Sequence, residues 1–174
     1  AIWEYLMTLA NSNYEDWRLA NPNEDIDNFK FSFSKMSKAG ALFDMVKLAD
    51  VSKNYICRLS AEEVYEMVTD WAKENNKKLY KLLVDDEEYA KAIFAIERGN
   101  AKPRKDISAW TDVENYVSYF YSELWDRKFD FPDNLSNDDM IEILELYKQI
   151  YDENVSSDDW FPQVRDMAET IGYA

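Results

Sequence analysis

Histidine is absent from these 174 residues, and cysteine, glycine and proline are scarce. Without histidine the chain lacks the commonest general base and the commonest metal ligand, and it can form no Ser/His or Cys/His catalytic pair. Its three glycines leave no phosphate-binding loop of the Walker or dinucleotide type. The single cysteine, Cys57, excludes an intramolecular disulfide, and we expect a buried structural thiol in a reducing compartment, the cytoplasm. We therefore expect no catalytic, cofactor-binding or metal-binding residues in this chain.

Basic residues are also few. The chain has 20 Lys and Arg and 35 Asp and Glu, which gives a formal net charge of −15. Phosphate contacts need Lys and Arg, so this balance argues against strong non-specific binding to nucleic acid, and we expect no DNA partner. A small basic patch that reads a defined RNA is still compatible with it. Long apolar runs are lacking too, so we expect neither a membrane-spanning segment nor a signal peptide. Because Ala1 is not an initiator methionine, we expect the chain to be part of a longer protein.

What the chain does contain is apolar residues at helical spacing. Hydrophobic residues make up 47% of the chain and aromatic residues 16%, which is typical of a globular protein. Scarce glycine and proline favour helices over a turn-rich β fold. The expected helices cover about 2–10, 14–20, 60–75, 79–83, 85–98, 111–125, 136–151 and 157–171. The sequence therefore predicts an all-α fold.

Local signals mark where several of these helices begin. Ser60 with Glu63 has the pattern of a capping box, and so does Thr111 with Glu114. One segment breaks the helical pattern, because phenylalanines alternate with other residues over 29–33. This alternation predicts a short strand.

An aromatic cluster follows the second capping box and could serve either as core or as a base-stacking surface. Its members recur at helical spacing, which is more often typical of core. The cluster consists of Tyr116, Tyr119, Phe120, Tyr121 and Trp125.

The four residues Lys35-Met-Ser-Lys38 match the ATP-loop signature of class I aminoacyl-tRNA synthetases. That loop supplies ammonium groups to ATP phosphates, and it needs a nucleotide-binding βαβ sheet and a histidine-containing partner motif. The chain has no histidine and no pattern of alternating strands and helices. A catalytic fragment that uses Lys35 and Lys38 is therefore an alternative that the remaining sequence disfavours.

Longer segments carry a more specific resemblance. In order and spacing they resemble the C-terminal part of bacterial-type glutamyl-tRNA synthetase, a class I enzyme. The segments are Ile2–Leu9, Phe33–Ser37, Gly40–Asp44, Lys47-Leu48, Lys53–Arg58, Ser60–Glu63 and Lys102–Lys105. One departure is Ala49-Asp50-Val51, which stands where the family has an aromatic residue. The resemblance covers nearly the whole chain.

The resemblance implies a helical bundle of the anticodon-binding type, preceded by a short stem-contact region. Residues 1–59 would be part of the stem-contact region, and 60–128 would be a helical anticodon-binding domain. Residues 129–174 would be the start of a second, truncated helical anticodon-binding domain.

The resemblance also implies which residues meet tRNA. Arg104 would read an anticodon base, because its planar fork can bond a base edge and stack on it. Lys102 and Lys105 would hold phosphates without reading sequence. Lys47 and Arg58 would face the tRNA backbone from the stem-contact region.

The function implied is that of a non-catalytic piece of glutamate–tRNA ligase that positions tRNA(Glu). The parent enzyme would use ATP and Mg²⁺, and the missing N-terminal catalytic domain of the same chain would be a partner. The alternative is a stand-alone acidic helical module that binds another protein, which the net charge of −15 would suit.

Overall fold

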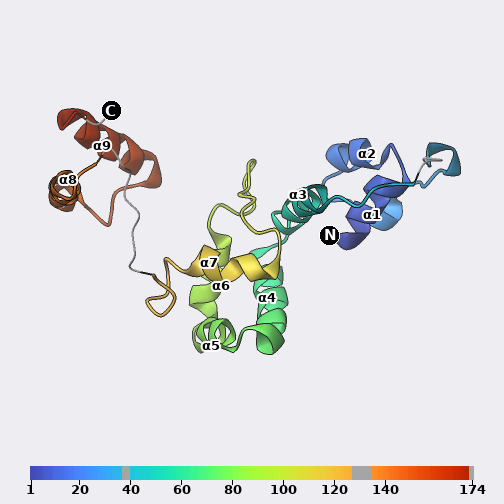
Figure 1. Cartoon of the computed structure of the whole chain (residues 1–174), viewed down its shortest axis with the longest axis horizontal. Helices are drawn as coiled ribbons and strands as arrows, with labels where there is room; N and C mark the ends of the chain where they lie inside the picture. Colours follow the sequence, from blue (N-terminus) through green and yellow to red (C-terminus); the bar gives the residue numbers. More distant parts are fainter. Residues whose placement is uncertain (37–39, 127–134, 173–174) are drawn as a thin grey trace. The chain divides into compact units, whose positions relative to one another are not determined.

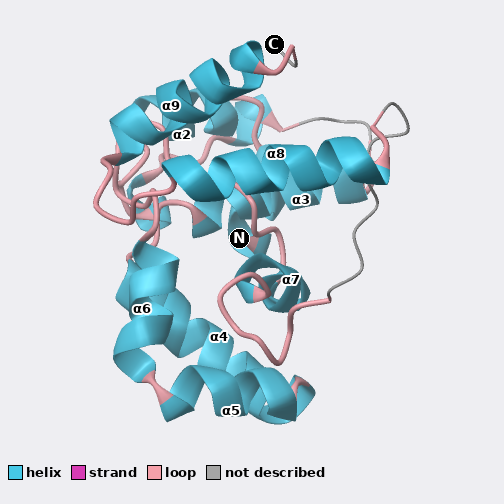
Figure 2. Ribbon diagram, turned by 90° about the vertical axis from the view of Figure 1, so that its left-hand side faces the viewer, coloured by secondary structure: helices cyan, strands magenta, loops and turns pink. Residues whose placement is uncertain are grey.

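In the computed structural model, the described residues 1–36, 40–126 and 135–172 form α-helices and short 3-10 helices, with no strand among them (Figures 1 and 2). This confirms the predicted all-α class. The chain divides into two compact units, Ala1–Asp126 and Arg127–Ala174. The predicted domain boundaries after residues 59 and 128 stay predictions.

The first unit opens with three helices, α1 (Ile2–Ala10), α2 (Tyr14–Ala20) and α3 (Met45–Ile56). Helix α1 packs against both α2 and α3. Asp44 caps α3 by accepting hydrogen bonds from two amides of its first turn, at 2.8 and 3.2 Å. Its own amide donates to the Tyr5 hydroxyl at 2.7 Å, so the start of α3 is fixed to α1.

The strand predicted over 29–33 is wrong. This segment is irregular and leads into the 3-10 helix η2 (Phe33–Lys35). The Asn11 side chain donates to the Ser32 carbonyl at 2.8 Å. The segment is therefore hydrogen-bonded to the end of α1 and pairs with no strand among the described residues. Its alternating phenylalanines do not belong to a β-sheet.

Four further helices form a bundle in the same unit: α4 (Ala61–Asn75), α5 (Lys77–Asp85), α6 (Glu87–Ala95) and α7 (Val113–Val117). Helix α4 packs against both α5 and α6, which also pack against each other (Figure 1). The core is apolar. Its side chains with at most 2% exposure are Val64, Val68, Ala72, Leu79, Leu83, Ala90, Ile93, Phe94, Val113 and Val117.

The capping box of Ser60 and Glu63 is confirmed. The Glu63 amide donates to the Ser60 hydroxyl oxygen at 3.1 Å, and the Ser60 amide donates to the Glu63 carboxylate at 2.7 Å. The box predicted at Thr111 is wrong, because the neighbouring Asp112 accepts from the Ser108 and Ala109 amides at 2.9 and 3.0 Å. A 3-10 turn at Trp110–Asp112 therefore precedes a short α7, which ends at Val117 instead of near residue 125.

The second unit contains α8 (Asn137–Ile150) and α9 (Ser157–Thr170), which pack against each other. Ser136 caps α8 with Asp139. The cap of α9 is Ser156, one residue before the predicted boundary. No helix in the described ranges is long and apolar enough to cross a bilayer.

Candidate functional site

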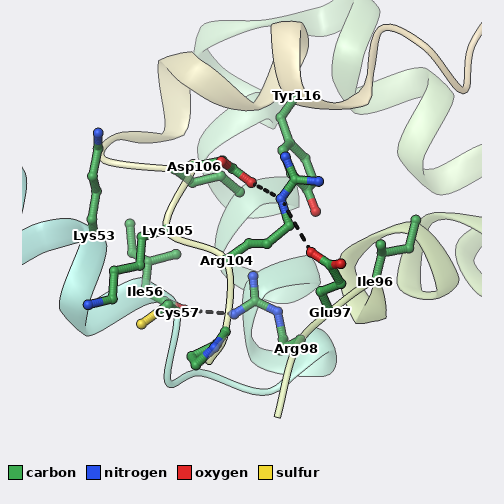
Figure 3. Close-up of a pocket in the computed structure, with 12 residues that line it drawn as sticks. Lys53, Ile56, Cys57, Ile96, Glu97, Arg98, Arg104, Lys105, Asp106 and Tyr116 are labelled. Atoms are coloured by element: carbon green, nitrogen blue, oxygen red, sulfur yellow. Dashed lines mark hydrogen bonds and ion pairs between the residues drawn. The ribbon is translucent and has the colours of Figure 1, made fainter. Parts of the chain in front are cut away.

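The segment between α6 and the turn at residue 110 carries the basic residues expected to bind RNA. It is irregular, and Pro103 fixes the backbone angle φ near the middle of the segment, which limits its conformational freedom. Figure 3 shows Arg104 and Lys105 pointing to opposite sides of the backbone. Two neighbouring positive side chains therefore serve two different surfaces.

The first surface, which we call the basic groove, is a cavity of about 440 Å³ on the Lys105 side. Lys105 shares its lining with Lys47 and Arg58, two residues predicted from a separate segment of the chain. Arg18 is the fourth basic residue in the lining, against three acidic ones, Glu4, Glu15 and Asp50. In a chain of net charge −15, this gathering of cations is a local exception.

Two of the four cations are held by buried Glu4. Its Oε1 atom lies 3.1 Å from an Arg18 nitrogen and 2.8 Å from an Arg58 nitrogen. The Glu4 side chain is 9% exposed, and the two arginines are 12% and 20% exposed. Both guanidinium groups therefore have little freedom to move, because one carboxylate orients them toward the same groove.

The other two cations are more available. Lys47 pairs with Glu15, whose hydrogen bond raises the Lys47 pKa, but its side chain remains 39% exposed. Lys105 is exposed and has no ion pair within the described part of the chain. A phosphate could thus approach Lys105 without first displacing a carboxylate.

Arg104 lies on the opposite side of the segment and is half exposed. Its Nε atom lies 2.6 Å from an Asp106 oxygen and 3.7 Å from a Glu97 oxygen, and the Asp106 hydrogen bond raises the Arg104 pKa (Figure 3). Glu97 has φ of 51°, a left-handed conformation that costs about 1 kcal/mol or more in a non-glycine residue. The guanidinium is therefore held by two carboxylates, and its far end lies beside Tyr116 (Figure 3).

Arg104 borders a second surface, which we call the aromatic groove, with a volume of about 670 Å³. Tyr116, Tyr119 and Phe120 line it together with Ile96. Its polar lining residues are Arg104, Asp106, Thr111, Asp112 and Asn115. Lys105 is not part of this lining, just as Arg104 is not part of the basic groove.

The region directly beneath the segment is almost closed. The cavity drawn in Figure 3 has about 10 Å³, roughly the space of one water molecule, so it offers no room for a nucleotide. Within residues 1–36, 40–126 and 135–172, no cluster of three His, Cys, Asp or Glu side chains could hold a metal ion. Lys35 ends η2, whereas Lys38 of the ATP-loop match lies outside the described residues.

The structure thus brings Lys47, Arg58 and Lys105 to one groove and leaves Lys102 exposed outside both grooves. Their contacts with RNA stay predictions, as does that of Arg104. Arg18 was not predicted as part of a site, because its contact with Glu4 joins two different helices.

The aromatic cluster divides between core and surface. Tyr121 is 8% exposed and belongs to the core, as expected, whereas Tyr119 is 79% exposed. The sequence held a signal for this, because Tyr119, Phe120 and Tyr121 are consecutive and cannot all face the core from one helix.

Comparison with known proteins finds glutamate--tRNA ligases along the whole chain. The ligase of Clostridium perfringens strain 13 is 40% identical over 178 residues, which cover 100% of this chain and 33% of the ligase. The ligase of Acetivibrio thermocellus is 40% identical over 174 residues, and that of Sorangium cellulosum is 42% identical over 173. The chain spans about a third of the length of these curated relatives. No family model and no solved structure matches.

Proposed function

We propose that this chain, which is similar in sequence to glutamate--tRNA ligases along its whole length, is a non-catalytic part of such an enzyme and binds tRNA(Glu) through the anticodon arm. The relatives lend no support to the alternative of a stand-alone protein-interaction module. Binding would hold the tRNA in place while another part of the ligase joins glutamate to its end.

The observation that carries this proposal is the basic groove. Lys47 and Arg58 come from one segment of the sequence and Lys105 from another, and the three line one cavity in a chain of net charge −15. A row of cations on a groove suits a phosphate backbone, while Arg104 on the other side suits a base edge. The groove would thus set the position of the RNA, and Arg104 would sample its sequence.

ATP and Mg²⁺ would bind in the part of the ligase that carries the chemistry, and the complete enzyme would act in the cytoplasm. We propose that this part docks on the N-terminal region of the chain that precedes α3. Large apolar side chains are exposed there, including Trp3 at 74%, Phe33 at 85% and Leu42 at 90%. An apolar surface of this kind typically marks a protein contact.

The test is binding of a fluorescent anticodon stem-loop of tRNA(Glu) to the 174-residue chain, measured by anisotropy at several salt concentrations. We expect Lys105→Ala to weaken binding of this RNA and of loop variants alike, and to lower the salt slope by about one. Lys81→Ala is the matched control, because Lys81 is exposed on α5 away from the basic groove.

Absence of any salt-dependent binding by the unaltered chain would contradict the proposed function. Equal effects of Lys105→Ala and Lys81→Ala would contradict the place of the basic groove in it, since both changes remove one positive charge.

A further inference from the structure

The exposed Tyr119 side chain projects from a turn whose backbone is held by hydrogen bonds. The Phe120 amide donates to the Val117 carbonyl at 2.9 Å, and the Tyr89 hydroxyl donates to the Phe120 carbonyl at 3.0 Å. The next residue, Tyr121, is buried and packs edge-on against Tyr89, with ring centroids 5.6 Å apart. Tyr119 therefore stands on a fixed backbone although its side chain is 79% exposed.

The surroundings of Tyr119 suit a nucleobase better than a phosphate. Arg104 offers N–H donors at one edge of the aromatic groove, and Asn115 offers an exposed amide that can donate and accept. Asp106 and Asp112 add acceptors and negative charge, which would repel a phosphate but can accept from base amino groups. Donors, acceptors and aromatic rings together match the edge and the face of a single base.

The two grooves lie on either side of one short segment. Lys105 lines the basic groove and Arg104 lines the aromatic groove, and the two side chains point apart (Figure 3). A single-stranded RNA crossing this segment could place a phosphate against Lys105 and a neighbouring base beside Arg104. The charge of each groove fits the part of the nucleotide it would receive.

We propose that the aromatic groove takes one unstacked base of an RNA loop, with Tyr119 as the stacking platform and Asn115 as a contact to the base edge. This inference rests on the proposed function and adds to it two residues that bind the RNA. Stacking on an aromatic ring tolerates any base, so Tyr119 supplies affinity, while Arg104 and Asn115 supply selectivity.

The experiment uses the 174-residue chain and anticodon stem-loops with 2-aminopurine at one loop position at a time. Stacking of the probe on Tyr119 quenches its fluorescence. We expect quenching at one loop position, lost in Tyr119→Ala and kept in Tyr119→Phe, which retains the ring. Tyr119→Ala should also weaken binding by roughly five- to a hundredfold. The control is Phe33→Ala, an aromatic residue of similar exposure (85%) outside the groove.

The outcomes separate the two proposals. If the unaltered chain does not bind the stem-loop, the proposed function fails and this inference fails with it. If the chain binds and Tyr119→Ala changes neither affinity nor quenching, the inference alone is overturned. A loss of binding in Tyr119→Phe equal to that in Tyr119→Ala would also overturn it, because the ring would then not be the contact.

Discussion

At the scale of single residues, two adjacent positively charged side chains line different surfaces. Arg104 and Lys105 are adjacent, yet one borders the aromatic groove and the other the basic groove. Arg104 is also held by Asp106 and Glu97, which leaves its fork in a defined orientation. A lysine could keep the charge here but not the planar fork, because its ammonium is a point charge on a flexible stem.

This difference predicts the result of changing Arg104. Arg104→Ala and Arg104→Lys should each cost about 1–3 kcal/mol of binding to the preferred anticodon loop and relax discrimination at one base. The measurement compares affinities for stem-loops altered at each anticodon position. Lys105→Ala is the contrast, with an even loss across all stem-loops. Even losses for the Arg104 variants as well would show that Arg104 reads no base.

At the scale of elements, a short local motif sets the start of the longest helix in the bundle. Ser60 and Glu63 satisfy each other's amides at the beginning of α4, whose inner face supplies Val64, Val68 and Ala72 to the core. The hydrogen bond from the Ser60 amide lowers the pKa of Glu63. The carboxylate form of Glu63 therefore stabilises the helix start.

We expect Ser60→Ala to lower the free energy of unfolding by about 1 kcal/mol, because the cap is lost. The contribution of Glu63 is present above its ordinary pKa of 4.5 and is lost as the pH falls through the lowered value. Urea unfolding at neutral pH and at pH below 4 measures both effects. Because Ser60→Ala keeps the amide that donates to Glu63, the carboxylate is tested with Glu63→Gln, which should be less stable than the unaltered chain at neutral pH and approach it at low pH. A difference between the chain and Glu63→Gln that stays constant down to low pH would contradict the role of the Glu63 carboxylate.

At the scale of the whole molecule, one arginine links the helices on either side of residue 59 within the first unit. Arg98 donates to the carbonyls of Ile56 and Leu59 at 2.7 and 3.0 Å and to that of Phe94 at 2.8 Å. Burial lowers its pKa, but an arginine keeps its charge. The end of α3 and the end of α6 are thus joined beneath the segment that carries Arg104 and Lys105 (Figure 3).

Arg98→Lys should destabilise the chain by about 2–3 kcal/mol, since lysine cannot reach three carbonyls with one fixed fork. Denaturant unfolding measures this loss, and Arg104→Lys on the exposed side is the matched control, with an expected change below about 0.5 kcal/mol. We also expect weaker RNA binding in Arg98→Lys, because Lys47 and Lys105 would lose their common alignment. Unchanged stability would mean that other contacts hold α3 against α6.

Features that depend on neighbouring residues and on composition could be predicted without the structure. The all-α class follows from helical spacing, the cap at Ser60 from local hydrogen bonds, and the burial of Cys57 from the apolar character of a lone thiol. The similarity to glutamate--tRNA ligases also lies in the sequence alone.

The remaining features depend on contacts between residues that are distant in sequence. The alternating phenylalanines form no strand because the segment after Phe29 is bound to the end of α1, and the cap at Thr111 fails because Ser108 and Ala109 engage Asp112. The basic groove likewise exists only once α3 and the 103–105 segment meet, since its residues are far apart in sequence. Spacing along the chain cannot reveal which side of an irregular segment a side chain faces. Arg104 and Lys105 differ in this respect, because Arg104 lines the aromatic groove and Lys105 lines the basic groove.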